Sequence, residues 1–113
     1  MAGPDRWHAD RRIVAAGAAH YDLMTPLAAG DRLRVRQLRV SSSAAAELVV
    51  YFGQADTDNV DGNRVFGDFV GANSGAAPDL ACQGAWAPRG GDRVRIYVSA
   101  AAIVHVAAEG DLD

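Results

Sequence analysis

Residues 31–41 read DRLRVRQLRVS, and this stretch decides the fold class because it alternates between apolar and polar residues. Leu33 and Val35 fall on one face of an extended chain. The next apolar residue, Leu38, is out of phase with them, since a strict period of two cannot join Val35 to Leu38. The stretch therefore predicts a β-strand that is interrupted by a β-bulge, or by a crossing between sheets, near residues 36–37.

Several other segments show the same alternation, or a short apolar run between turn residues. In residues 93–99 (RVRIYVS), Val94 and Ile96 share one face while Arg93 and Arg95 share the other. No segment carries the sustained apolar stripe of a helix. About eight short strands predict an all-β fold, specifically an antiparallel, jelly-roll-like β-sandwich. The strand candidates are residues 12–16, 20–23, 31–41, 47–52, 65–70, 80–86, 93–99 and 103–107.

A length of 113 residues predicts one domain. Residues 1–11 are mostly polar, so we expect them to form an N-terminal arm outside the core. The β-sandwich domain then covers residues 12–113 and ends in an acidic tail at residues 109–113. Trp7 in the arm is expected either to fold back on its own domain or to dock on a partner.

The chain also repeats a short pattern. Residues 30–35 (GDRLRV) are similar to residues 91–96 (GDRVRI), and each segment leads to a serine, three alanines and an apolar strand. The repeat predicts two similar hairpins, with two sheets built on one plan. Chance is the alternative explanation, because Ala, Arg and Asp are abundant in this chain.

The composition argues against several classes of function. The net charge is −3 and no basic cluster is present, which argues against nucleic acid as the primary ligand. No apolar run approaches the ~20 residues that span a membrane. Cys82 is the only cysteine, so an intrachain disulfide is impossible and folding in a reducing cytoplasm is expected. An alanine-rich core predicts modest stability, which burial against other subunits would increase.

The sequence has no motif for catalysis or for a cofactor, so we expect no enzyme activity, no catalytic residue and no cofactor. The loop at residues 54–64 contains Asp56, Asp58 and Asp61, whose carboxylates are candidate ligands for a hard cation. A solvated turn-rich loop is the alternative. It is favoured because Val60 stands at the fifth position of the EF-hand pattern, which needs an oxygen ligand.

Arginines on the strand candidates form the main candidate binding surface. If the two repeated strands are neighbours, their polar residues form one arginine-rich sheet face. This face is either a solvated surface or a docking surface for an acidic protein. The candidate partner-binding residues are Trp7, Arg32, Arg34, Arg36, Arg93 and Arg95.

The order of these segments carries a resemblance to a known group of proteins. It rests on the placement of Gly, Ala and Val residues in the following segments: Ile13–Gly17, Pro26–Val35, Leu38–Ala46, Trp86, Gly91–Ile96, Ser99–Ala101 and the closing strand. The chain resembles the small β-sandwich virion proteins of tailed bacteriophages, which include capsid decoration (cement) proteins and head-fibre bases. The resemblance implies a structural protein, made in the host cytoplasm, that binds the major capsid protein on the capsid surface. It also implies a homotrimer at local three-fold sites and no catalytic residues.

The leading hypothesis is therefore a capsid decoration protein that bridges coat subunits and stabilises the shell. A head-fibre, tail or receptor-binding module is an alternative of the same kind. A carbohydrate-binding β-sandwich is an alternative of another class, with Trp86, Tyr97 and Tyr51 as stacking platforms if they are exposed. A cupin-like metalloprotein is disfavoured because metal-binding histidines at suitable spacing are missing.

Overall fold

The structure, a computed structural model, describes residues 5–28, 30–77 and 92–112. Each predicted strand in this part of the chain is present, and a short additional strand lies at residues 74–76. The strands are β1 (Asp5–Ala15), β2 (Ala19–Asp22), β3 (Leu33–Ser42), β4 (Ala46–Gly53), β5 (Arg64–Val70), β6 (Ser74–Ala76), β7 (Arg93–Val98) and β8 (Ala102–Leu112).

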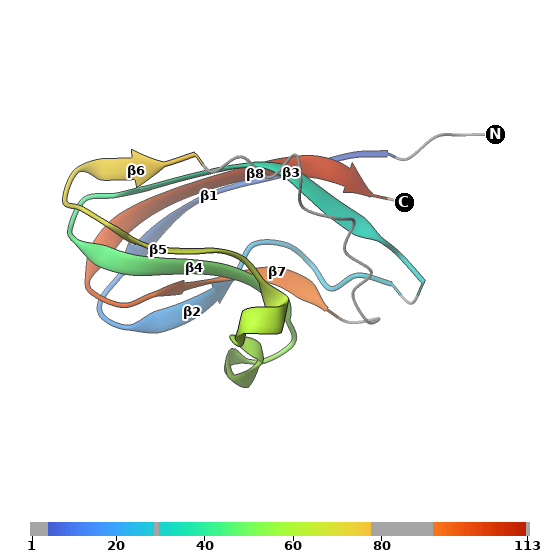
Figure 1. Ribbon diagram of the computed structural model, residues 1–113, viewed down its shortest axis with the longest axis horizontal. Helices are drawn as coiled ribbons and strands as arrows, with labels where there is room; N and C mark the ends of the chain where they lie inside the picture. Colours follow the sequence, from blue (N-terminus) through green and yellow to red (C-terminus); the bar gives the residue numbers. More distant parts are fainter. Residues whose placement is uncertain (1–4, 29, 78–91, 113) are drawn as a thin grey trace.

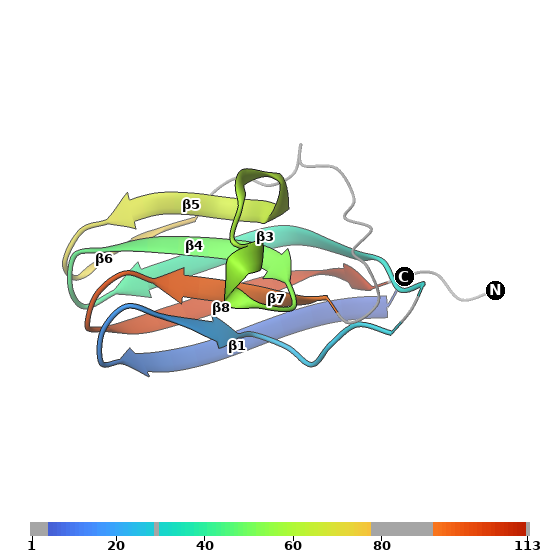
Figure 2. The same ribbon diagram turned by 90° about the horizontal axis from the view of Figure 1, so that it is seen from below.

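The strands form two antiparallel sheets of four, which pack face to face as the layers of a sandwich (Figure 1). Sheet A has the order β1-β8-β3-β6, and sheet B has the order β2-β7-β4-β5. Figure 2 looks onto sheet B, with β5, β4 and β7 side by side in front of sheet A. The β-sandwich of about eight strands that the sequence predicts is confirmed.

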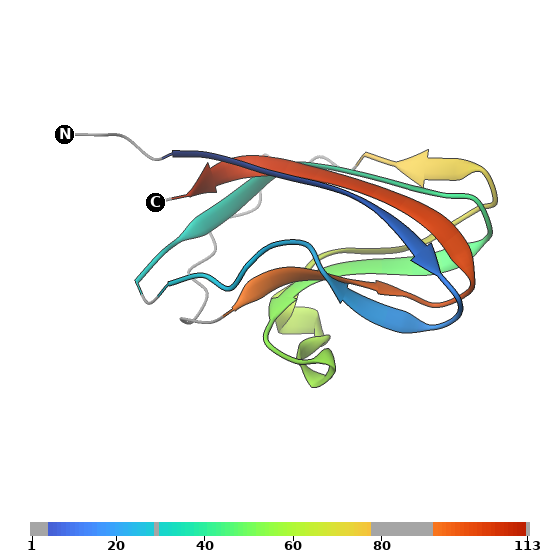
Figure 3. The same cartoon turned by 180° about the vertical axis from the view of Figure 1, so that it is seen from behind.

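The strand pairing follows one rule. β1 pairs with β8, β2 with β7, β3 with β6, and β4 with β5, so the chain forms one long antiparallel ribbon. The ribbon is rolled up so that β3 also pairs with β8, and β4 with β7. This is the topology of a jelly roll. Figure 3 shows β1 and β8 lying side by side along the length of sheet A.

The core lies between the inner faces of the two sheets. Because alternate residues of a strand point to opposite faces, β7, β8 and β3 on either side of its phase change contribute every second residue to it. Leu33 and Val104 from sheet A and Leu48, Val50 and Ile96 from sheet B are fully buried there. The alternation seen in the sequence therefore positions the outward residues of both sheets as the available functional surface.

The predicted phase change in β3 is a β-bulge. The register between β3 and β8 shifts between Val35 and Gln37, so Arg36 and Gln37 are both exposed. Gly110 lies opposite the bulge, and a Cβ atom at this position would overlap the carbonyl oxygen of Arg34. The bulge therefore requires glycine at position 110, because two backbones approach closely there.

Two predictions about the ends of the chain are wrong. Residues 5–11 do not form an arm, because β1 pairs with β8 without a break over 11 residues. Residues 109–112 are not a tail either, since they form the other side of this ladder. The alternation in β1 is obscured by Arg11, because it occupies a position in the same alternating series as the inward-facing Ile13 and Ala15. Its guanidinium turns aside and donates to the carbonyl oxygen of Asp22.

The repeated segments are not hairpins within one sheet. β3 lies in sheet A and β4 in sheet B, whereas β7 lies in sheet B and β8 in sheet A. Each repeat therefore crosses between the layers. The strand candidate at residues 80–86, which includes Cys82, lies outside the described residues. In the part of the chain that is described, no helix has the length and apolar character needed to cross a membrane.

Candidate functional site

The outer face of sheet A brings together residues that are far apart in the sequence. β8 lies between β1 and β3, so each outward residue of β8 has a neighbour on both sides. Ala107 lies between Asp10 of β1 and Arg39 of β3. In the next row, Glu109 lies between His8 and Gln37.

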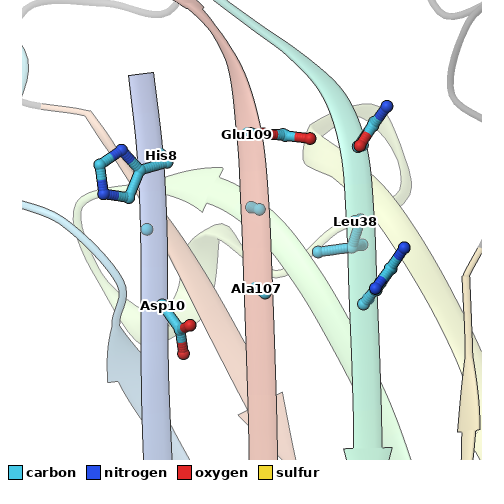
Figure 4. Close-up of a pocket in the computed structure, with 9 residues that line it drawn as sticks. His8, Asp10, Leu38, Ala107 and Glu109 are labelled. Carbon is cyan, nitrogen blue, oxygen red and sulfur yellow. The ribbon is translucent and has the colours of Figure 1, made fainter. Parts of the chain in front are cut away.

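The short side chain of Ala107 leaves a depression between its longer neighbours. The depression has a volume of about 330 Å³ and is lined by β1, β8 and β3 (Figure 4). It continues into a second depression of about 430 Å³, which shares Asp10 and Arg39 with the first. A third, of about 440 Å³, shares Ser41 and His105 with the second. We call this continuous surface feature the sheet A groove.

The side chains around the groove offer both hydrogen-bond donors and acceptors. In Figure 4 the carboxylate of Asp10 points from β1 toward β8, and that of Glu109 points from β8 toward β3. His105 Nε2 lies 3.5 Å from Asp10 Oδ1. Leu38 also lines the depression, but it is buried and its side chain belongs to the core. The groove therefore combines charged side chains with an apolar lining that includes Ala107.

The end of sheet A next to the groove is basic. Arg6 and Arg34 both lie in register with Asp111, and Arg36 forms an ion pair with the same carboxylate. Arg32 is exposed directly before β3 begins. We call Arg6, Arg32, Arg34, Arg36 and Asp111 the basic end. Three of these arginines are either in register with Asp111 or bind it, whereas the whole chain has a net charge of −3.

Trp7 does not stand free on this surface. It lies on β1 in register with Gly110, on the inner side of the sheet, and packs against the hydrophobic core. Its side chain is half-buried, so it supports the basic end from beneath. Of the two readings that the sequence allowed, folding back on its own domain fits the structure.

Arg93 and Arg95 lie on the other side of the molecule, so the single arginine-rich sheet face expected from the repeat does not exist. β7 belongs to sheet B and pairs with β2 and β4, not with β3. Arg95 Nε donates to Asp22 at 2.7 Å, and Arg93 binds the same carboxylate at 3.1 Å. The side chain of Arg95 is only 11% exposed. These two arginines are engaged within their own domain.

Arg95 also belongs to an aromatic cluster on the outer face of sheet B. It donates to the Tyr51 hydroxyl at 3.2 Å, and that hydroxyl is 2.7 Å from His20 Nδ1. The His20 ring lies against Tyr97, with ring centroids 4.8 Å apart. Tyr51 is 0% exposed, and burial raises its pKa to about 12, although the positive charge of Arg95 opposes this. A fully buried Tyr51 cannot be a stacking platform for a sugar, and Trp86 lies outside the described residues.

The loop at residues 54–64, which we call the aspartate loop, contains two short 3₁₀ turns, η1 (Asp56–Asp58) and η2 (Asp61–Asn63). Its three candidate ligands each have a different partner. Asp56 binds Arg95 at 2.9 Å, and Asp61 binds Arg64 at 2.7 Å. Asp58 Oδ2 accepts hydrogen bonds from the backbone of residues 54 and 55. Among the described residues, no group of three His, Cys, Asp or Glu side chains is placed to hold a metal ion.

Sequence reasoning missed the groove. Asp10, Ala107 and Arg39 come from three strands, and only the register of those strands brings them into one row. One local signal was present: an alanine at an outward position of a strand leaves a gap beside longer polar side chains. No protein-family model matches the chain, and no curated protein matches it.

Proposed function

We propose that this protein is a structural virion protein of a tailed phage, a capsid decoration protein that docks on the outer capsid surface. The observation that carries the proposal is the basic end. Arg6, Arg34 and Arg36 are exposed on sheet A of a net acidic protein, and Arg32 is exposed directly before β3. Arginine forks make planar, paired hydrogen bonds to carboxylates, so this surface suits an acidic face of a coat subunit.

The fold supports the proposal by analogy. Jelly rolls occur in viral capsid proteins and also in lectins and cupins, so topology alone does not select one function. What favours a structural role is the rigidity of the basic end. It lies on paired strands with Trp7 packed beneath it, and a rigid surface loses little conformational entropy on docking.

The mechanism is a clamp. A decoration protein that contacts two coat subunits adds buried area between them, and it stabilises the shell because it binds only the assembled form. A homotrimer at a local three-fold site would present three basic ends at once, which raises the effective affinity of each contact. The partner is then the major capsid protein, and the site of action is the capsid surface. A head-fibre, tail or receptor-binding module is the alternative of the same kind.

Co-sedimentation with empty shells tests the proposal. The shells are those of the phage that encodes the chain, purified without the protein. We expect the wild type to pellet with them and the Arg34→Glu/Arg36→Glu variant to stay in solution. Arg12→Glu/Arg64→Glu is the matched control, because it changes the net charge equally but lies outside the basic end, and it should still bind. Binding should weaken as salt rises. Failure of the wild type to bind shells would overturn the proposal.

A further inference from the structure

We propose that the sheet A groove binds a neutral oligosaccharide. This site is separate from the basic end, because no residue of the basic end lines any of the three depressions. It is also on the opposite sheet from Tyr51 and Tyr97.

The shape of the groove suits a short, extended ligand. It follows β8 from Glu109 to Ile103, which is about 20 Å at ~3.4 Å per strand residue. Its lining includes the small residues Ala107, Ser41 and Gly75. A chain of several sugar rings fits such an open, shallow surface better than a compact cofactor, which needs an enclosed pocket.

The chemistry of the walls suits hydroxyl groups. A sugar hydroxyl donates one hydrogen bond and accepts others, so it needs both kinds of partner in reach. Asp10 offers only acceptors when ionised and Arg39 offers only donors, and they flank Ala107 from opposite sides. Gln37 and Ser41 add groups that do both. A ligand lying over Ala107 is thus met by an acceptor on one side and a donor on the other.

The charge of the lining selects a neutral ligand. Two carboxylates, Asp10 and Glu109, and one guanidinium, Arg39, line the groove. An anionic ligand would meet the two carboxylates, and a cationic ligand would meet Arg39. Neither sign of charge is favoured along the whole length.

The groove is poorly suited to a peptide. Strands β1, β8 and β3 are already paired with one another, so their backbones cannot accept an added strand over this face. The largest apolar residues that line the first two depressions, Leu38 and Val40, are buried in the core and give no anchoring pocket. Over the first depression, which lies between β1, β8 and β3, a peptide would therefore find neither main-chain partners nor an apolar pocket. The second and third depressions reach the edge strand β6, and the third also reaches the exposed Ile103.

A glycan array tests the inference. The probes are immobilised neutral gluco-, galacto-, manno- and xylo-oligosaccharides, and the strongest hit is then titrated into ¹⁵N-labelled protein. We expect amide shifts centred on residues 105–109. Ala107→Leu fills the groove and Arg39→Ala removes the donor, so each should weaken binding roughly tenfold or more, which corresponds to about 1.4 kcal/mol. Ala101→Leu and Arg34→Ala, which lie outside the groove, should bind as the wild type does.

The outcomes are distinct. Absence of binding to every neutral oligosaccharide overturns the inference, and so does a hit whose affinity is unchanged in both groove variants. Selection of peptides from a random hexapeptide library, with loss in Ala107→Leu, would assign the groove to another ligand class and also overturn it. Shell binding by Ala107→Leu is measured in parallel, so that failure of the groove and failure of capsid docking can be told apart.

Discussion

Ser43 and Ser99 make reciprocal hydrogen bonds. Ser43 binds Ile103 in the strand that follows Ser99, and Ser99 binds Glu47 in the strand that follows Ser43. Ser43 donates its backbone N–H to the carbonyl oxygen of Ile103, and its hydroxyl accepts from the Ile103 N–H at 2.8 Å. Ser99 makes the same two bonds to Glu47, the second at 2.7 Å. Each serine precedes three alanines, and Glu47 and Ile103 follow those alanines directly. The repeated sequence pattern therefore has a structural role: the β3–β4 connection is hydrogen-bonded to β8, and the β7–β8 connection is hydrogen-bonded to β4.

Replacing either serine with alanine should destabilise the fold. Ser43→Ala and Ser99→Ala each remove the acceptor of a backbone N–H, and we expect each to lower the free energy of unfolding by about 1 kcal/mol. Urea denaturation followed by circular dichroism measures this. Ser41→Ala is the control, because Ser41 is exposed on sheet A, and it should change stability by less than about 0.5 kcal/mol. If Ser41→Ala and Ser43→Ala lowered the free energy of unfolding equally, the stabilising role of the Ser43 hydrogen bonds would be contradicted.

Gly110→Ala should be the most damaging single methyl addition in the described part of the chain. A methyl group there would overlap the carbonyl of Arg34, so the bulge or the β3–β8 pairing must give way. We expect a loss of more than about 3 kcal/mol, or failure to fold. Gly62→Ala, where the added Cβ meets nothing within 4 Å, should be tolerated. Thermal melts of the two variants compare them, and similar melting temperatures would show that the bulge is adaptable.

Tyr51 should make stability fall at alkaline pH. The folded protein holds the Tyr51 proton up to about pH 12, whereas an unfolded chain releases it near pH 10. The stability that comes from keeping Tyr51 protonated is therefore fully present below pH 10 and is lost as the pH rises toward 12. Urea midpoints measured from pH 8 to pH 11.5 should fall less steeply for Tyr51→Phe than for the wild type. Parallel curves for the two proteins would refute the raised pKa.

Arg95→Met should release the aspartate loop. Burial lowers the pKa of Arg95, but hydrogen bonds to Asp22 and Asp56 raise it above its ordinary value, so the guanidinium stays charged and bonded. Its loss should cost about 1–3 kcal/mol. Hydrogen exchange at the amides of residues 55–58 should become faster, because the link from η1 to sheet B is gone. Arg34→Met is the control, because Arg34 is exposed on sheet A. If hydrogen exchange at residues 55–58 were unchanged in Arg95→Met, the role of Arg95 in attaching η1 to sheet B would be contradicted.

The strands that the sequence predicts best are those with large apolar residues at alternate positions. β3, its bulge and β7 follow from Leu33, Val35 and Ile96. The first half of β1 does not, because its inward positions hold Trp7, Ala9 and Arg11, and an alternation of small, aromatic and charged residues carries little hydrophobic contrast.

The candidate sites are harder to predict than the strands because they depend on which strands pair. Alternation shows that Arg34 and Arg95 both point away from a core, but not that they lie on opposite layers. That difference decides their chemistry. Arg34 faces outward at the basic end, whereas Arg95 is enclosed by Asp22, Asp56 and Tyr51. Burial of an arginine is set by its neighbours in space, which come from three other segments of the chain.

The place of β8 in sheet A constrains the order in which the protein can form. β8 is the partner of both β1 and β3, yet it comes last among the strands, with Asp5 facing Leu112. A growing chain on the ribosome can therefore assemble sheet B as far as β7, whereas β1 has no strand partner, and β3 has only β6, until residues 102–112 emerge. Contacts of such high sequence separation make folding slow. Until then the apolar inner sides of β1 and β3 are unprotected, and the nascent chain is at its most vulnerable to aggregation.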